Sequence, residues 1–106
     1  MAYPADVYLG QVMARHVMPR LGEGRRLVPR VETALTLAAL ELAAEGIGIA
    51  WVPASLARAA IAEGRVADLS DRLPGCELAV TAVRLARQGD GLVAAVWDDL
   101  ARAAAA

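Results

Sequence analysis

A junction near the middle of the chain, residues 46–53, constrains its fold more than any other stretch. It follows directly on a run of helix-forming residues, 34–45, and opens with Gly46. Glycine readily adopts the left-handed backbone conformation that commonly ends a helix. Residues 47–52 then form a continuous apolar run, which Pro53 closes. Strands covered on both faces have such runs, so the junction predicts an α/β fold with a parallel sheet.

Further helices and strands are predicted to alternate along the chain. Helical spacing of apolar residues predicts four helices, at 6–18, at 33–45, from residue 54 or 55 to 63, and at 90–103. Asp6, Thr33 and Asp90 are the expected N-terminal caps, and Gly46 and Gly64 the expected C-terminal ones. Short apolar runs predict strands at 26–31, 47–52, 65–69 and 77–84. The alternation indicates β-α-β units, and therefore a mixed, mostly parallel sheet with flanking helices.

The composition predicts one small domain, or part of one, that needs a partner. The chain has 106 residues, of which 58% are apolar, and it has no Phe. Soluble domains average roughly 45–50% apolar residues even when Gly is counted. A chain of this length buries little more than about 60% of its unfolded surface, so its own core is small. We therefore expect apolar surface to face a missing half of the domain or a second subunit, and we expect a homo-oligomer.

Charge and special residues exclude several function classes. The net charge is -1, and no basic stripe of the kind that follows nucleic-acid phosphates is present. With one His and one Cys the chain offers no metal-ligand set and no internal disulfide, which is typical of a reducing cytosol. Glu41 and Glu45 interrupt the longest apolar run, and the first residues do not resemble a signal peptide. We expect a cytoplasmic protein without membrane contact.

No group of residues has the pattern of a catalytic centre. His16 lacks a second ligand or a triad partner, and the adjacent Asp98 and Asp99 point in different directions on a helix. Gly46 and Gly48 precede a strand rather than a helix, which is the wrong context for a dinucleotide-binding loop. We therefore expect no enzyme activity, no metal and no cofactor.

Two ordered motifs carry a family resemblance. Residues 42–53, LAAEGIGIAWVP, resemble the pattern V-A-A-G-x-G-I-A-x-x-P of the effector-binding domain of LysR-type transcriptional regulators. Residues 60–69, AIAEGRVADL, are similar to the L-x-x-G-x-L-V-x-L segment that follows in that family. The strand predicted near residue 78 and the closing helix have the same order. The resemblance covers about residues 26–102.

The resemblance implies a fold and a role. Such domains have two α/β lobes of the periplasmic-binding-protein type 2 fold, with a small-molecule effector between them. Residues 1–106 would form a single partial domain, namely most of the second lobe and the return into the first. DNA binding would reside in a winged helix-turn-helix that this chain lacks, so the chain itself should not bind an operator.

Three residues are candidate ligand contacts. Thr33 and Thr36 lie where a helix starts, and the backbone N–H groups at such a position favour an anion such as a carboxylate. The alternative is structural: Thr33 caps the helix, and the Thr36 hydroxyl bonds back to it. Trp51 lies at the end of a strand, where α/β sheets bind ligands, although packing also explains a buried indole.

Two other classes remain open. A solute-binding protein of a transport system has the same general two-lobe fold, and an upstream signal peptide in the parent gene would identify it. A dimerising interaction module would use its apolar surface for a partner and would bind no small molecule.

Overall fold

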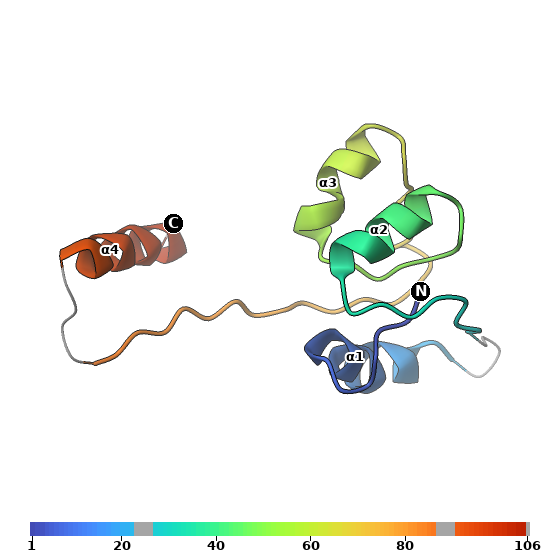
Figure 1. Cartoon of the computed structure of the whole chain (residues 1–106), viewed down its shortest axis with the longest axis horizontal. Helices are drawn as coiled ribbons and strands as arrows, with labels where there is room; N and C mark the ends of the chain where they lie inside the picture. Colours follow the sequence, from blue (N-terminus) through green and yellow to red (C-terminus); the bar gives the residue numbers. More distant parts are fainter. Residues whose placement is uncertain (23–26, 87–90, 106) are drawn as a thin grey trace.

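The computed structural model describes residues 1–22, 27–86 and 91–105, and within them only helices are regular elements (Figure 1). The first helical stretch is continuous but changes its winding from α to π to 3-10. In chain order the elements are α1 (Tyr8–Val12), η1 (Met13–Val17), η2 (Met18–Arg20), α2 (Thr36–Ala44), α3 (Ala54–Ala62) and α4 (Gly91–Ala105).

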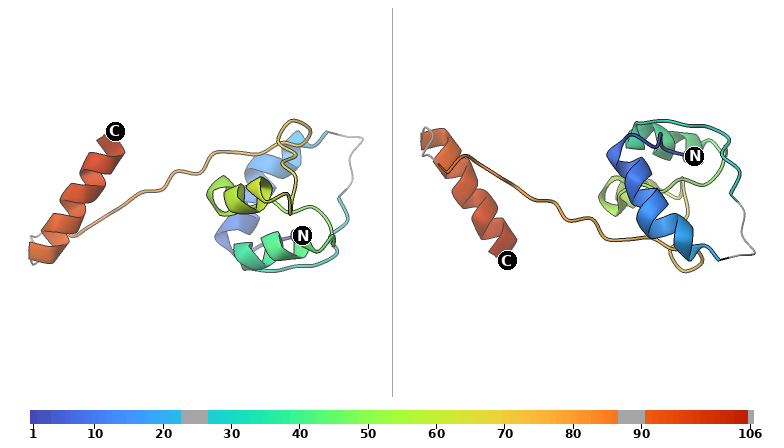
Figure 2. Two further views of the ribbon diagram at one scale, coloured as in Figure 1. Left: turned by 90° about the horizontal axis from the view of Figure 1, so that it is seen from above. Right: turned by 90° about the horizontal axis from the view of Figure 1, so that it is seen from below.

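The chain divides into a body, residues 1–76, and an arm, which comprises residues 77–86 and α4. The body gathers α1, α2 and α3, whereas residues 77–86 run away from it in extended form and carry α4 at their far end (Figures 1 and 2). The radius of gyration is 17.5 Å and the longest extent is 53 Å. A compact domain of 100 residues has a radius of gyration of about 13 Å, so the arm makes the molecule markedly extended.

The predicted ends of α2 and α3 are confirmed. Gly46 has a φ of 85°, its amide donates to the carbonyl of Ala43 (3.0 Å), and the amide of Ile47 donates to that of Leu42 (3.1 Å). These two bonds form a Schellman motif, which satisfies carbonyls that the helix leaves free. The same pair of bonds follows α3, where Gly64 has a φ of 74°.

The predicted starts of α1 and α2 are wrong in detail, whereas α3 begins at Ala54, one of its two predicted first residues. The residue before α1 is Val7 and the residue before α2 is Leu35, and neither helix has a side-chain cap. Asp6 is exposed in a turn, and Thr33 lies three residues before Thr36, the first residue of α2. The expected cap of α4, Asp90, lies outside the described residues.

The predicted α/β fold with a mostly parallel sheet, of the periplasmic-binding-protein type, is wrong for this structure. Among the described residues the only strand-type pairing is one parallel bridge between Ala2 and Glu32. The predicted strand 47–52 is extended, yet Ile47 and Ile49 are 41% and 44% exposed. Residues 77–84 are extended and exposed throughout. The reason is that a strand needs a neighbour along its hydrogen-bonding edge, and the described parts of the chain offer these segments too little to pair with.

The first residues of the chain make the parallel bridge and one further backbone contact. Ala2 donates to the carbonyl of Val31 (2.8 Å) and accepts from the amide of Thr33 (2.9 Å). On the other side, the Met1 amino group donates to the carbonyl of Ile49 at 2.5 Å. Residues 1–3 thus join two extended segments that are far apart in sequence, one around residues 31–33 and one at residues 47–52. These three stretches run in the same direction. The helices that follow them, α1, α2 and α3, all begin on the side of the body that faces the arm (Figure 1).

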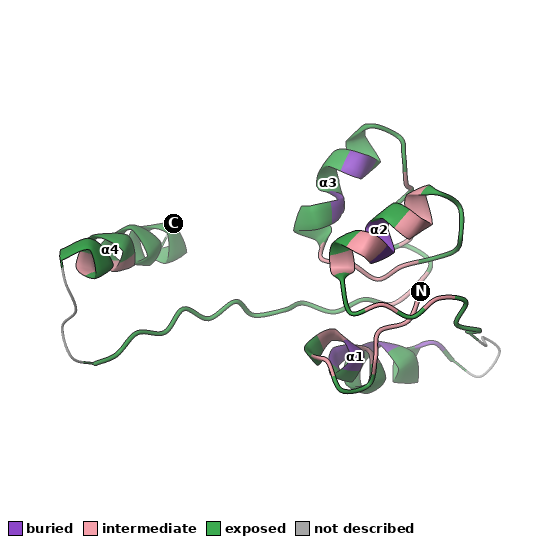
Figure 3. Cartoon of the chain, in the orientation of Figure 1, coloured by how far each residue is buried: buried purple, intermediate pink, exposed green. Residues whose placement is uncertain are grey.

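The core of the body is small and lies in two places (Figure 3). Between α2 and α3, Leu40 packs with Ala57 and Ala60, and Val52 and Val66 lie against them. Val12 and Val17 are buried in the first helical stretch, and Leu21 is buried directly after it. Because much of the buried surface is alanine, each contact removes little apolar area from water. An exposed ion pair between Glu41 and Arg65, 2.6 Å apart, also joins α2 to the end of α3.

Candidate functional site

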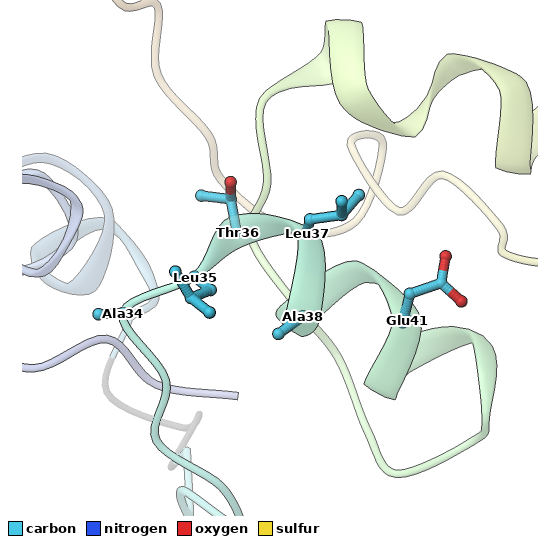
Figure 4. A pocket seen from close by; sticks show the side chains of 6 residues that line it. All are labelled: Ala34, Leu35, Thr36, Leu37, Ala38 and Glu41. Atoms are coloured by element: carbon cyan, nitrogen blue, oxygen red, sulfur yellow. The ribbon is translucent and has the colours of Figure 1, made fainter.

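A hollow of about 580 Å³ lies at the start of α2 (Figure 4). Its lining comes from the segment that leads into the helix and from the first turns of the helix. Four of the lining residues are apolar and two, Thr36 and Glu41, are polar; the full set is Ala34, Leu35, Thr36, Leu37, Ala38 and Glu41. Leu35 and Leu37 remain 67% and 59% exposed, so the walls of the hollow are apolar side chains in contact with water.

The backbone at this position presents free hydrogen-bond donors. Thr36 is the first residue of α2, and the first bond of the helix runs from the amide of Ala39 to the carbonyl of Leu35, at 3.0 Å. The amides of residues 36–38 therefore have no partner within the helix. The Thr36 hydroxyl also has no hydrogen-bond partner among the described residues. Three N–H groups, a hydroxyl and the positive end of the helix dipole together favour an anion.

The acidic residue of the hollow is partly neutralised. The carboxylate of Glu41 lies 2.6 Å from the guanidinium of Arg65, and this hydrogen bond raises the pKa of Arg65 above its ordinary value. Both side chains are about half exposed, at 50% and 43%. Since the arginine balances its charge, Glu41 adds little repulsion against an anion at the start of the helix.

Thr33, the first predicted ligand contact, has a local structural role. Its hydroxyl accepts a hydrogen bond from the amide of Leu35 at 3.1 Å, and its own amide bonds to Ala2. The residue is half-buried and is not part of the lining of the hollow. It shapes the turn that leads into α2, and a ligand-binding role for it stays a prediction.

Trp51 holds the last loop of the body. Its indole Nε1 donates to the carbonyl of Pro74 at 2.8 Å, and its own carbonyl accepts a bond from the hydroxyl of Tyr3 at 2.5 Å. Arg20 donates to the carbonyl of Gly75, the residue after Pro74, at 2.6 Å. Of the three predicted contacts, only Thr36 lines the hollow, and ligand contact by Trp51 stays a prediction.

Comparison with known proteins decides the family. The LysR substrate binding domain family has a model that matches residues 9–105, which include α2, its hollow and the arm. The chain belongs to this family. The resemblance of residues 42–53 and 60–69 is thereby confirmed. No curated protein and no solved structure matches the chain closely enough to count as a relative.

Family membership indicates the general role of this LysR-type domain. The family is one of transcriptional regulators, generally not enzymes, whose substrate-binding domain takes up a small-molecule effector. Its fold is of the periplasmic-binding-protein type, whose sheet the described residues of this chain do not contain. The hollow at α2 lies inside the matched region, as does most of the chain.

Tyr3, which precedes the matched residues 9–105, makes a contact that sequence reasoning missed. Its hydroxyl reaches Trp51, 48 residues away along the chain, and partial burial raises its pKa above the ordinary value of 10.0. Nothing in the sequence signals this contact, because residues 1–3 show no motif and no periodicity. Tyr3 connects the first residues to the 47–52 segment, which follows α2.

Other kinds of site find no support in the described part of the LysR-type domain. No group of three or more His, Cys, Asp or Glu residues there could hold a metal ion. Cys76 and His16 are exposed. Among the helices described, none combines the length and apolarity needed to cross a membrane.

Proposed function

We propose that this chain is the effector-sensing part of a cytoplasmic LysR-type transcriptional regulator, and that it binds a small organic anion at the start of α2. The observation that carries the proposal is the family match over residues 9–105, which includes the hollow with its free helix-start amides. A carboxylate fits these donors because each of its oxygens accepts two hydrogen bonds.

The walls of the hollow favour a ligand with an apolar body. Leu35 and Leu37 flank Thr36 in sequence, and both have large exposed side chains. Covering them with an aliphatic or aromatic group gains about 25 cal/mol for each Å² removed from water. The ligand class is thus a carboxylate that carries a hydrocarbon or aromatic group, with its charged end at residues 36–38.

Binding would be transmitted through the segments that meet at residues 1–3. The Thr33 amide bonds to Ala2, and Tyr3 bonds to Trp51. An effector that orders the start of α2 would favour one arrangement of these segments over another. In the parent protein, residues 1–106 would supply the second lobe and the return into the first, and a winged helix-turn-helix elsewhere would bind DNA. Effector and DNA affinity would then be linked reciprocally.

Calorimetric titration of the full chain with small carboxylates and aromatic acids tests the proposal. Thr36→Val removes only the hydroxyl, and Thr81→Val makes the same change at an exposed threonine of the arm. A hydrogen bond to a charged group contributes about 1.5–3 kcal/mol, so Thr36→Val should weaken binding roughly tenfold or more. Thr81→Val should bind as the wild type does. Equal affinities of Thr36→Val and the wild type would contradict the site, and no binding of any acid would contradict the ligand class.

A further inference from the structure

We infer that a second hollow, between α4 and residues 82–84 of the arm, binds an unbranched aliphatic carboxylate of about the length of hexanoate. Arg84 is the charged contact of this site, and an apolar stripe of α4 is its wall. None of the lining residues belongs to the hollow at the start of α2, so the inference does not depend on what binds there.

The second hollow has the size of a site for a small molecule. Its volume is about 340 Å³, and small-molecule sites range over about 300–1,000 Å³. Residues 82–84 form one side, and five residues of α4 form the other. The arm holds this hollow away from the body, and no residue of the body lines it (Figure 2).

Arg84 is the one charged residue in the lining. Its guanidinium lies over the ring of Trp97, 4.9 Å from the centroid, and this cation–π contact holds the side chain at the hollow. Among the described residues the Arg84 side chain makes no ion pair and no hydrogen bond. Stacking uses the face of the guanidinium and leaves the N–H groups in its plane available, in the fork that fits a carboxylate. The charge and geometry of Arg84 therefore favour a carboxylate ligand.

The acidic residues described in the arm leave the charge of Arg84 in place. Asp98 and Asp99 do not line the hollow, and Asp99 is bonded to Arg102 instead. Glu77 is at the other end of the extended segment, where a rise of about 3.3 Å per residue carries it far from Arg84. An anionic ligand at Arg84 therefore meets attraction from the guanidinium without a carboxylate of the lining to oppose it.

The apolar stripe of α4 favours a ligand with an extended chain. Leu92, Val96 and Leu100 recur at four-residue spacing, so they lie on one side of the helix, and all three line the hollow. They are 73%, 50% and 48% exposed, so a ligand that covers them removes apolar surface from water. At 1.5 Å per residue the stripe extends about 12 Å along the helix axis. An unbranched aliphatic chain can follow this length, whereas a single aromatic ring covers only part of it.

Tryptophan fluorescence of the full chain, titrated with hexanoate, tests the inference. In Trp51→Phe the remaining indole is Trp97, which lines the hollow, and its emission should change saturably. From butyrate through hexanoate to octanoate the dissociation constant should fall, by up to about fourfold for each CH₂ group that becomes fully buried. Hexylamine has the same chain with the opposite charge and should not bind. An emission of Trp97 that ignores hexanoate, or equal binding of hexylamine, would overturn the inference.

Two variants test the charged contact and the wall. Arg84→Gln should weaken hexanoate binding roughly tenfold or more, because it removes a hydrogen bond between charged groups. Arg58→Gln makes the same change at an exposed arginine of α3 and should bind as the wild type does. Val96→Thr keeps the shape of the wall but adds a hydroxyl, so it should also bind more weakly, with unchanged helical circular dichroism. If Arg84→Gln and Arg58→Gln bound equally well, the contact with Arg84 would be refuted.

Thr36→Val separates this site from the proposed effector site. The variant changes only the hollow at the start of α2, so the response of Trp97 to hexanoate should be that of the wild type. A response that is lost in Thr36→Val and kept in Arg84→Gln would place hexanoate at α2 and overturn the inference, while it would support the proposed function.

Discussion

Gly10→Ala tests the packing in the body, because two effects on the free energy of unfolding oppose each other there. Helix propensity favours alanine, whereas the carbonyl of Pro4 leaves no room for its Cβ. Gly10 lies inside α1, where replacing Gly by Ala normally stabilises a helix by about 1 kcal/mol. In this structure a Cβ at position 10 would lie 1.9 Å from the carbonyl oxygen of Pro4 and 2.8 Å from its carbonyl carbon. The obstacle is backbone, so no side-chain rotation relieves it.

The expected loss of stability in Gly10→Ala depends on how the Pro4 carbonyl must shift. The Pro4 carbonyl also accepts the amide of Val7 at 3.2 Å, so shifting it opens the turn that leads into α1. Overpacking of this kind costs about 1–3 kcal/mol, and a contact this short belongs at the upper end. After the gain of about 1 kcal/mol in helix propensity, Gly10→Ala should lower the free energy of unfolding by about 2 kcal/mol.

Urea and thermal unfolding followed by circular dichroism measure this difference. Gly48→Ala is the matched control, since a Cβ at Gly48 meets nothing within 4 Å and its φ is not positive. The control should be neutral, or stabilising by up to about 1 kcal/mol through the unfolded state. If Gly10→Ala proved as stable as the control, the close approach of Pro4 to α1 would be refuted.

Three further predictions concern the segments that join the body. Gly46→Ala should lower the free energy of unfolding by about 1–2 kcal/mol in urea melts, because alanine must adopt the left-handed φ of 85°. Tyr3→Phe should cost about 1 kcal/mol by losing the bond to Trp51, with the 65% exposed Tyr8→Phe as a neutral control. Because burial raises the pKa of Tyr3 above 10.0, the contribution of its hydroxyl to the free energy of unfolding should be complete below pH 10. It should be lost as the pH rises through the raised pKa. A free energy of unfolding that does not change over this pH range would contradict the burial of Tyr3. Trp51→Phe should free the loop at Pro74 and speed amide exchange of residues 75–77, and unchanged exchange would argue against the indole bond.

The helices were predictable from sequence because their signals are local. Apolar spacing placed all four helical stretches, and Gly46 and Gly64 ended two of them as expected. The caps at Asp6 and Thr33 failed, since a turn at Pro4 and a hydroxyl bond to Leu35 set the first residues of those helices. Such bonds depend on the path of the preceding chain, which periodicity does not contain.

The sheet was not predictable because a strand depends on partners far away in sequence. The apolar run 47–52 has the composition of a buried strand, and it is extended. Apart from the helix-ending bond from Ile47 to Leu42, its backbone is hydrogen-bonded to Met1 and Tyr3 alone among the described residues. Residues 77–86 meet no partner strand among the described residues. Nothing lies within 4 Å of the Cβ position of Gly48, so no helix packs closely against the segment there.

The candidate site was only partly predictable. The family pattern and the helix start pointed to Thr36, which lines the hollow, whereas Thr33 and Trp51 make structural hydrogen bonds beside it. The role of Tyr3 depends on a contact across 48 residues, for which no local signal exists.

Nuclear magnetic resonance of the chain's amides, recorded while a carboxylate is added, tests whether an anion binds at the start of α2. We expect saturable shifts at the free amides of residues 36–38, with smaller ones at Thr33 and Ala2, which share a hydrogen bond. Shifts confined to the arm or to α3, or none with any small carboxylate, would contradict an anion site at the start of α2.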